Sequence, residues 1–199
     1  MEHDGQEPTD PAPAQRAGGD DGGTLPSPRP IVLAYETLKD PRDLAEVIHF
    51  SAGLGAEIHL LGKSLDPRHW KVLRKLRSWR PGLAGCPSAI HAKTYTDAAA
   101  WAQEVRARGF VIAGTVLEGG ESPWSGSLAS APAGAVASGI AVLFGEETHG
   151  LGPQARSLCD VLWTLPLGTG GRFYTIGQTT AMILGALKAM ECGGESSST

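Results

Sequence analysis

The sequence has little cysteine and no long hydrophobic run. Cys86, Cys159 and Cys192 are the three cysteines among 199 residues, and their spacing fits neither a metal site nor a disulfide framework. Such low cysteine usage favours a reducing cytosol, so we expect a cytoplasmic protein. No apolar run approaches the ~20 residues that a membrane-spanning helix needs. With metal-spaced clusters also absent from the sequence, we expect neither a membrane protein nor a metal site.

The net charge of −4 is concentrated at the N-terminus. Residues 1–30 hold six acidic and two basic side chains, so residues 31–199 are neutral overall. The first thirty residues are rich in Pro and Gly, show no apolar periodicity and lack the apolar core of a signal peptide. We therefore predict a disordered tail over 1–30, one domain over 31–191 and a disordered C-terminal tail over 192–199.

Basic residues cluster between residues 63 and 80. Asp66 is the only acid among seven cations, which are Lys63, Arg68, Lys71, Arg74, Lys75, Arg77 and Arg80. One interpretation is a phosphate-binding face. The other is an ordinary solvated helix face that covers Trp70, Leu73 and Leu76.

Short apolar runs alternate with helical patterns along the chain. Strands are predicted at 31–35, 57–61, 90–93, 110–116, 140–144 and 161–165. Helix starts are predicted at Asp40 followed by Pro41, at Thr96, near Pro153 and at Ile176, the last helix running to Met190. This order predicts an α/β fold with a mostly parallel sheet covered by helices on both faces.

Two of these strands run into glycine-rich loops, Gly145–Gly150 and Pro166–Gly171, each followed by a helix. We expect the two strands to end side by side. Ligands of open α/β sheets usually bind at such carboxyl ends. A third loop, 118–139, is rich in Gly, Ser, Ala and Pro, and its length is typical of a lid or substrate loop with Trp124 as its large side chain.

The motif Gly145-x-Glu147-x-x-Gly150-Leu151, followed by Leu165-Pro166-Leu167 and a closing helix, resembles the SPOUT methyltransferases. The similarity is to the SpoU/TrmH branch, in its minimal single-domain form, and spans residues 31–190 in element order. It implies a deep C-terminal trefoil knot and S-adenosylmethionine as cofactor, without a metal. It also implies a homodimer formed through the first and last helices, where Ala181, Ala186 and Ala189 would allow close packing.

The resemblance also assigns the cofactor site. Backbone groups of the knot loops hold the cofactor in this family, and glycines permit close backbone approach. The implied cofactor-binding residues are Gly114, Thr115, Gly145, Glu147, Gly150, Leu165, Leu167, Phe173, Thr175 and Ile176.

The sequence departs from the family on the acceptor side. The family segment Asn-x-Gly-x-x-x-Arg, whose Arg is catalytic, matches Asp43, Ala45 and His49 here, and the family Ser-x-Asn matches Phe173 and Thr175. Asp43 also suits a first-turn helix position, and His49 also suits a surface histidine. The candidate catalytic residues are His49, Asp43, Glu147 and Thr175, and the candidate substrate-binding residues are His49, Glu36, Trp124, Arg172 and Tyr174.

These departures favour a changed acceptor. The resemblance implies a methyltransferase, and the altered positions point to a nucleoside-like small molecule, as in natural-product assembly, in place of ordinary ribose methylation. Two alternatives stay open. One is a tRNA or rRNA 2′-O-ribose methyltransferase, which the basic cluster favours, and the other is an inactive module that binds cofactor or RNA.

Overall fold

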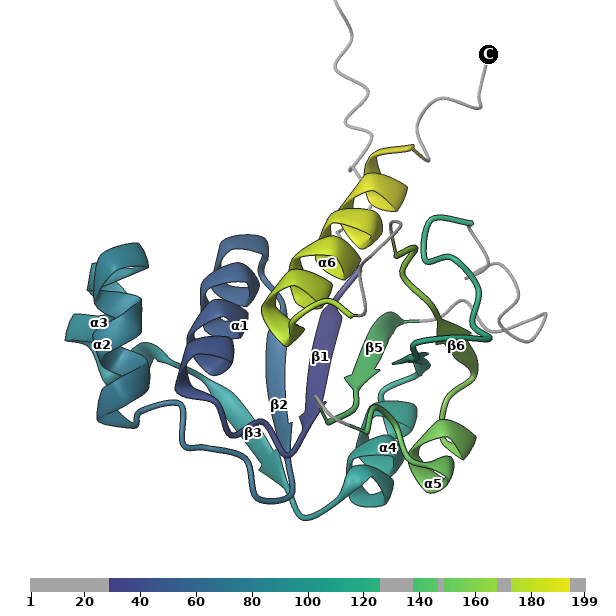
Figure 1. Ribbon diagram of the computed structural model, residues 1–199, viewed down its shortest axis with the longest axis horizontal. Helices are drawn as coiled ribbons and strands as arrows, with labels where there is room; N and C mark the ends of the chain where they lie inside the picture. The colour runs from purple at the N-terminus through teal and green to yellow at the C-terminus, as the bar shows by residue number, and fades with distance from the viewer. Residues whose placement is uncertain (1–28, 126–137, 147–148, 168–172, 194–199) are drawn as a thin grey trace, which may run out of the picture.

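Six parallel strands form one sheet in the order β3-β2-β1-β5-β4-β6 (Figure 1). The computed structural model describes residues 29–125, 138–146, 149–167 and 173–193. The strands are β1 (Ile31–Glu36), β2 (Glu57–Leu61), β3 (Ala92–Tyr95), β4 (Phe110–Thr115), β5 (Gly139–Phe144) and β6 (Val161–Trp163). The predicted α/β class with a parallel sheet is confirmed.

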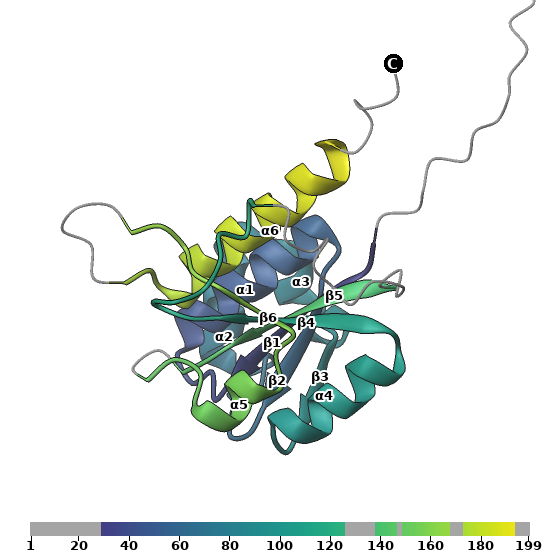
Figure 2. The ribbon, with the colours of Figure 1, turned by 90° about the vertical axis from the view of Figure 1, so that its right-hand side faces the viewer.

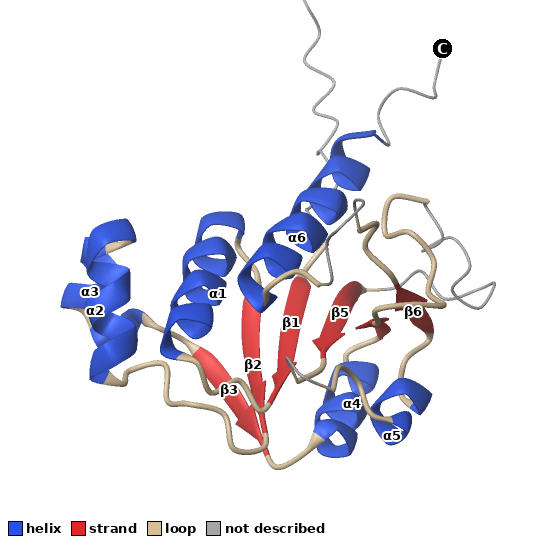
Figure 3. Cartoon of the chain, in the orientation of Figure 1, coloured by secondary structure: helices blue, strands red, loops and turns tan. Residues whose placement is uncertain are grey.

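Helices cover both faces of this sheet, as Figures 2 and 3 show. The helices are α1 (Pro41–Leu54), α2 (Trp70–Trp79), α3 (Pro81–Gly85), α4 (Ala98–Ala107), α5 (Pro153–Ser157) and α6 (Ile176–Gly193), with a 3₁₀ turn η1 (Pro87–Ala89). The helices α1, α2 and α6 pack on one face, and α4 and α5 pack on the other. None of the helices in the described part of the chain is long and apolar enough to cross a membrane.

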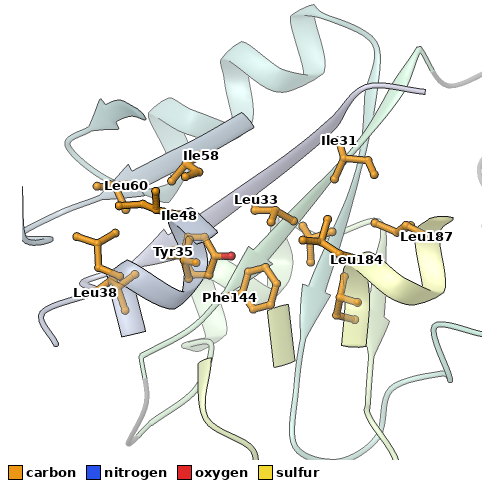
Figure 4. Close-up of a cluster of buried hydrophobic side chains, with 14 of the residues drawn as sticks. Ile31, Leu33, Tyr35, Leu38, Ile48, Ile58, Leu60, Phe144, Leu184 and Leu187 are labelled. Atoms are coloured by element: carbon orange, nitrogen blue, oxygen red, sulfur yellow. The ribbon is translucent and has the colours of Figure 1, made fainter. Parts of the chain in front are cut away.

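The central strands are apolar without interruption because both of their faces are covered. In β1, Leu33 and Tyr35 join the core under α1 and α6 (Figure 4), whereas Val32 and Ala34 join the core under α4. All four side chains are at most 1% exposed. The continuous apolar runs of the sequence therefore correspond to strands buried on both sides.

Helix α1 begins as its sequence predicts. The Asp40 carboxylate accepts hydrogen bonds from the backbone N–H groups of Arg42 and Asp43, and Pro41 occupies the first turn. The helix ends at Gly55, whose φ of 70° is the left-handed conformation that glycine adopts at little cost. This start and end orient the helix so that Asp43, in its first turn, lies at the carboxyl edge of the sheet.

Three local expectations are corrected. The N-cap of α4 is Asp97, whose side chain accepts from the Ala100 N–H, and not the neighbouring Thr96. The third strand lies at Ala92–Tyr95, two residues beyond the predicted 90–93. The strands β5 and β6 do not end side by side, because β4 lies between them in the sheet.

The sheet has its topological switch at its centre. The chain leaves β1 into α1 on one face and leaves β5 into α5 on the opposite face, although β1 and β5 are neighbours. Connections that diverge in this way open a crevice at the carboxyl ends of the strands. The edge formed by the ends of β1, β5, β4 and β6 is therefore where a ligand site is expected.

Several sequence expectations concern residues that are not described. The predicted tails fall mainly on 1–28 and 194–199, and the knot depends in part on 147–148 and 168–172, so both stay predictions. Among the three alanines expected at a dimer interface, Ala186 is fully buried inside the protomer, whereas Ala189 is exposed. Ala186 is therefore not available to a dimer interface, and the homodimer stays a prediction.

Candidate functional site

A cavity of about 480 Å³ lies at the carboxyl ends of β4, β5 and β6 and is bordered by the start of α6. Its volume falls in the range typical of small-molecule sites. Its lining comes from five segments: Asp43; Thr115–Leu117; Phe144–Glu146 with Gly150; Trp163, Leu165 and Leu167; and Phe173–Ile176 with Thr179. Segments distant in the sequence thus converge on one pocket.

The loop after β5 forms one wall, and its shape depends on glycine at two positions. A Cβ on Gly145 would overlap the backbone of Gly150 and Leu151, so only glycine permits this close approach. Gly150 has a φ of 62°, and its N–H donates to the carbonyl of Glu146 at 2.8 Å. The two ends of the loop therefore lie against each other, and Gly145 and Gly150 line the pocket with backbone alone.

The opposite wall is fixed by the segment that leads into α6. The Tyr174 hydroxyl donates to the carbonyl of Pro166 at 2.7 Å. Thr175 and Gln178 form a reciprocal cap: the Thr175 Oγ1 accepts from the Gln178 N–H at 3.2 Å, and the Gln178 Oε1 accepts from the Thr175 N–H at 3.0 Å. The Thr175 hydroxyl therefore already serves the helix start.

Aromatic side chains form the base of the pocket. Phe144 lines it and stacks on Tyr35 behind it, with ring centroids 4.7 Å apart. The Tyr35 hydroxyl shares a buried 2.9 Å hydrogen bond with Thr180, and burial raises the pKa of Tyr35, so its phenol stays neutral. Trp163 is 1% exposed, and its Nε1 has no hydrogen-bond partner among the residues that the structure describes. The base is thus buried, closely packed and almost entirely apolar.

Among the described residues, Asp43 and Glu146 bring carboxylates to this pocket. Glu146 lies 3.4 Å from the Nδ1 of His149. Glu36 lines a second cavity, of about 540 Å³, on the other side of the β5–α5 loop. Burial and the neighbouring charge of Glu146 raise the pKa of Glu36.

The structure brings together most residues that the resemblance assigned to the cofactor. The predicted residues that line the pocket are Asp43, Thr115, Gly145, Gly150, Leu165, Leu167, Phe173, Tyr174, Thr175 and Ile176. Glu147 and Arg172 lie outside the described residues. Gly114 and Trp124 are not among the residues that line the pocket. A Cβ on Gly114 would press on Cys159 and Leu151, so this glycine permits close packing on the α5 side of the sheet.

His49 lies outside the pocket lining. Its ring packs against Phe50 and Trp79, with centroids 5.2 and 5.7 Å away, and its backbone carbonyl accepts from Arg80. The side chain of His49, which α1 carries, therefore packs against the end of α2. A role for His49 in turnover stays a prediction.

Sequence reasoning missed six residues of the pocket lining: Val116, Leu117, Phe144, Glu146, Trp163 and Thr179. Glu146 follows Gly145 directly, so its position in the motif was an available signal. Thr179 lies one helical turn after Thr175, on the same face of α6. Trp163 gave no such signal. An apolar residue in a strand is normally assigned to the core, and only the positions of the neighbouring segments show that it lines a pocket.

Four cations of the basic cluster, Lys71, Arg74, Lys75 and Arg77, lie exposed on α2. Trp70 is 59% exposed, with the Lys71 Nζ 5.6 Å and the Arg74 Cζ 5.2 Å from its ring centroid. Leu76 is fully buried beneath this face, as predicted. The expectation that Trp70 would also be covered is wrong, because it begins the helix, where the neighbouring cations stack on it.

Solved structures with similar folds were found, whereas no protein-family model and no curated protein matches the chain. The SpoU methyltransferase AviRb from Streptomyces viridochromogenes superposes with a TM-score of 0.67 at 20% identity, over 88% of this chain. That chain is longer, and only 65% of it is covered; it has also been solved with AdoMet.

Two further structures extend the comparison. An AdoMet-bound rRNA methyltransferase from Sinorhizobium meliloti gives a TM-score of 0.66 at 20% identity, over 83% of this chain and 58% of that chain. A structure concerning 2-OH methylation of C/U34 on tRNA gives 0.65 at 17% identity, over 83% of this chain and 99% of that chain. The chain therefore has the fold of the SpoU/TrmH methyltransferases, as its motifs predicted.

Proposed function

We propose that the protein is an S-adenosylmethionine-dependent methyltransferase that binds its cofactor in the pocket at the ends of β4, β5 and β6. The observation that carries this proposal is the wall made by Gly145 and Gly150, because it presents bare backbone to an apolar pocket of suitable volume. The AdoMet-bound neighbours with the same fold support it.

The residues present fit such a ligand. Phe144, Trp163 and Leu165 offer apolar surface for a purine ring. The carboxylate of Glu146 suits the positive charge of the ammonium group of such a ligand. When bound, S-adenosylmethionine supplies an electrophilic methyl group.

The protein's part in the reaction is to position the acceptor and to accept its proton. The acceptor atom must lie about 3 Å from the methyl carbon, in line with the departing sulfur. A hydroxyl acceptor must also lose a proton, and Asp43 is the carboxylate at the start of α1 that we assign to accept it. Thr175 is less suited to this task, because its hydroxyl oxygen caps α6.

The acceptor that we favour is a nucleoside-like small molecule. At the position matching the family serine, Phe173 has no hydrogen-bonding group, and Asp43 and His49 stand where the family has Asn and Arg. The second candidate is RNA, with 2′-O-ribose methylation. The exposed face of α2, where Trp70 is flanked by cations, favours this candidate, and related folds include RNA 2′-O-ribose methyltransferases.

The decisive experiment is calorimetric titration with S-adenosylmethionine and S-adenosylhomocysteine, followed by labelled methyl transfer to RNA and to a panel of nucleosides. The variant Gly145→Ala should lose at least tenfold in affinity, because the added Cβ must push the loop away from Gly150. The matched control is Gly152→Ala in the same loop, where a Cβ would meet no atom within 4 Å.

The binding and transfer measurements distinguish the alternatives. Wild-type protein that binds neither ligand at millimolar concentration refutes the proposal. Equal affinities for the Gly145→Ala and Gly152→Ala variants would show that the cofactor binds elsewhere. Binding without transfer to any acceptor would support the inactive-module alternative. Circular dichroism of both variants checks that they are folded.

A further inference from the structure

Three large apolar side chains in the pocket lining remain exposed. Phe173 is 67% exposed, Leu117 is 60% exposed and Leu167 is 37% exposed. They come from three separate segments, after β4, after β6 and before α6. Exposed apolar groups that gather beside a cavity mark a surface that a ligand or partner covers. Phe144 and Trp163, at 1% exposure, lie deeper in the same cavity, so the three exposed side chains form its mouth.

The backbone that follows Phe173 is held in place. The next residue, Tyr174, is tied to the Pro166 carbonyl through its hydroxyl, and Thr175 is fixed by the reciprocal cap with Gln178. Phe173 is therefore attached to an anchored segment, although its ring faces solvent. Stacking of a ligand on the ring then has to order the two side-chain torsions of Phe173 but not the backbone that follows it.

The exposed apolar side chains at the mouth of the cavity favour a ligand with a flat, apolar surface. A polar group placed against Phe173 would lose its hydrogen bonds to water and gain none, which opposes binding. An aromatic ring placed there loses nothing of this kind and gains stacking and dispersion. Asp43 belongs to another part of the lining, where its carboxylate is assigned to the reacting portion of the acceptor.

We propose that Phe173 determines acceptor specificity by stacking on a planar heteroaromatic ring of the acceptor, with Leu117 and Leu167 beside it. The proposal deepens the proposed function and rests on it, because it assumes that the cofactor occupies the inner pocket. It assigns the acceptor to molecules whose reacting atom is attached to, or lies near, such a ring.

The test uses 2-aminopurine riboside, whose fluorescence is quenched by stacking, titrated into full-length protein saturated with S-adenosylhomocysteine. Wild-type protein should quench the probe. The variant Phe173→Ser should bind it about 5- to 100-fold more weakly, the range for removing one base–aromatic stack. The variant Phe173→Tyr keeps the ring and should bind within about twofold of wild type. Leu54→Ser, which removes an exposed apolar side chain at the end of α1 and outside the pocket lining, is the control and should bind like wild type.

Affinity for S-adenosylhomocysteine is measured separately for each variant. An unchanged affinity in Phe173→Ser supports the acceptor role, whereas a loss equal to that of the probe would assign Phe173 to the cofactor and overturn the inference. Wild-type binding of the probe by Phe173→Ser would also overturn it, as would the absence of probe binding to cofactor-loaded wild-type protein. Wild-type protein that binds the probe but not S-adenosylhomocysteine would refute the proposed function instead.

Discussion

Protonation of one buried histidine should make the stability of the protein depend on pH. His59 on β2 is fully buried, and its Nδ1 accepts from the Trp101 Nε1–H at 3.1 Å. Its Nε2 therefore carries the proton and faces the Glu57 carboxylate at 3.3 Å. Burial lowers the pKa of His59 to about 4, and Lys93 and Arg108 add to this shift, although the hydrogen bond and charge of Glu57 oppose it.

The magnitude follows from the difference between the folded and unfolded states. An unfolded histidine titrates near 6.5, and at 1.36 kcal/mol per pH unit the gap to about 4 corresponds to roughly 3 kcal/mol. Because the folded pKa is the lower one, the unfolded chain binds the extra proton between pH 6.5 and 4. This contribution to stability is therefore complete above pH 6.5 and is lost as the pH falls towards 4.

The assay is thermal unfolding, followed by circular dichroism between pH 7 and pH 4.5. A loss of this size should lower Tm by roughly 5 to 10 °C in a domain of this length. The variant His59→Gln keeps an acceptor for Trp101 and a donor for Glu57 but cannot titrate, so its Tm should fall less over the same range. His91→Gln, at an exposed site, is the control and should follow the wild type. If His59→Gln lost as much Tm as the wild type, the buried neutral histidine would not be the cause.

Two other changes test the base of the pocket and the basic face. Tyr35→Phe should lower the free energy of unfolding by about 1 kcal/mol, because it leaves the buried Thr180 hydroxyl without its 2.9 Å partner; urea denaturation measures this, and an unchanged midpoint would show that the bond contributes nothing. Replacing Arg74, Lys75 and Arg77 together by Gln should weaken binding and flatten its salt dependence if the acceptor is RNA. The same triple variant should leave transfer to an uncharged nucleoside unaffected, so the salt slope measured on the active acceptor distinguishes the two substrates.

Local signals in the sequence were sufficient to predict most helices and strands and some of the residues that line the pocket. Asp40 and Pro41 fixed the start of α1, and Gly55 fixed its end, because caps depend only on neighbouring residues. The capping box of Thr175 and Gln178 was also readable from its spacing but was missed, and Thr175 was instead predicted to be catalytic. Thr96 and Asp97 are both good cap residues, so the wrong one was predicted.

Features that depend on contacts between distant segments could not be predicted from local signals. Strand order depends on which apolar run pairs with which, and nothing local in β4 shows that it lies between β5 and β6. The surroundings of His49 come from α2, thirty residues further along the chain. The motif residues Gly145, Gly150, Leu165 and Leu167 do line one pocket, because the resemblance supplied the long-range arrangement that local patterns lack; their cofactor-binding role stays a prediction.

The position of β1 between β2 and β5 has a consequence for how the protein folds. Ile31 pairs with Ile140, and Tyr35 is bonded to Thr180, a separation of 145 residues. Contacts of such high sequence separation require a large loop to close before they contribute, which slows folding. During synthesis the edge of β1 that pairs with β5 therefore stays unpaired until β5 has left the ribosome. Folding should be completed late, when α6 docks on the face formed by α1 and the central strands.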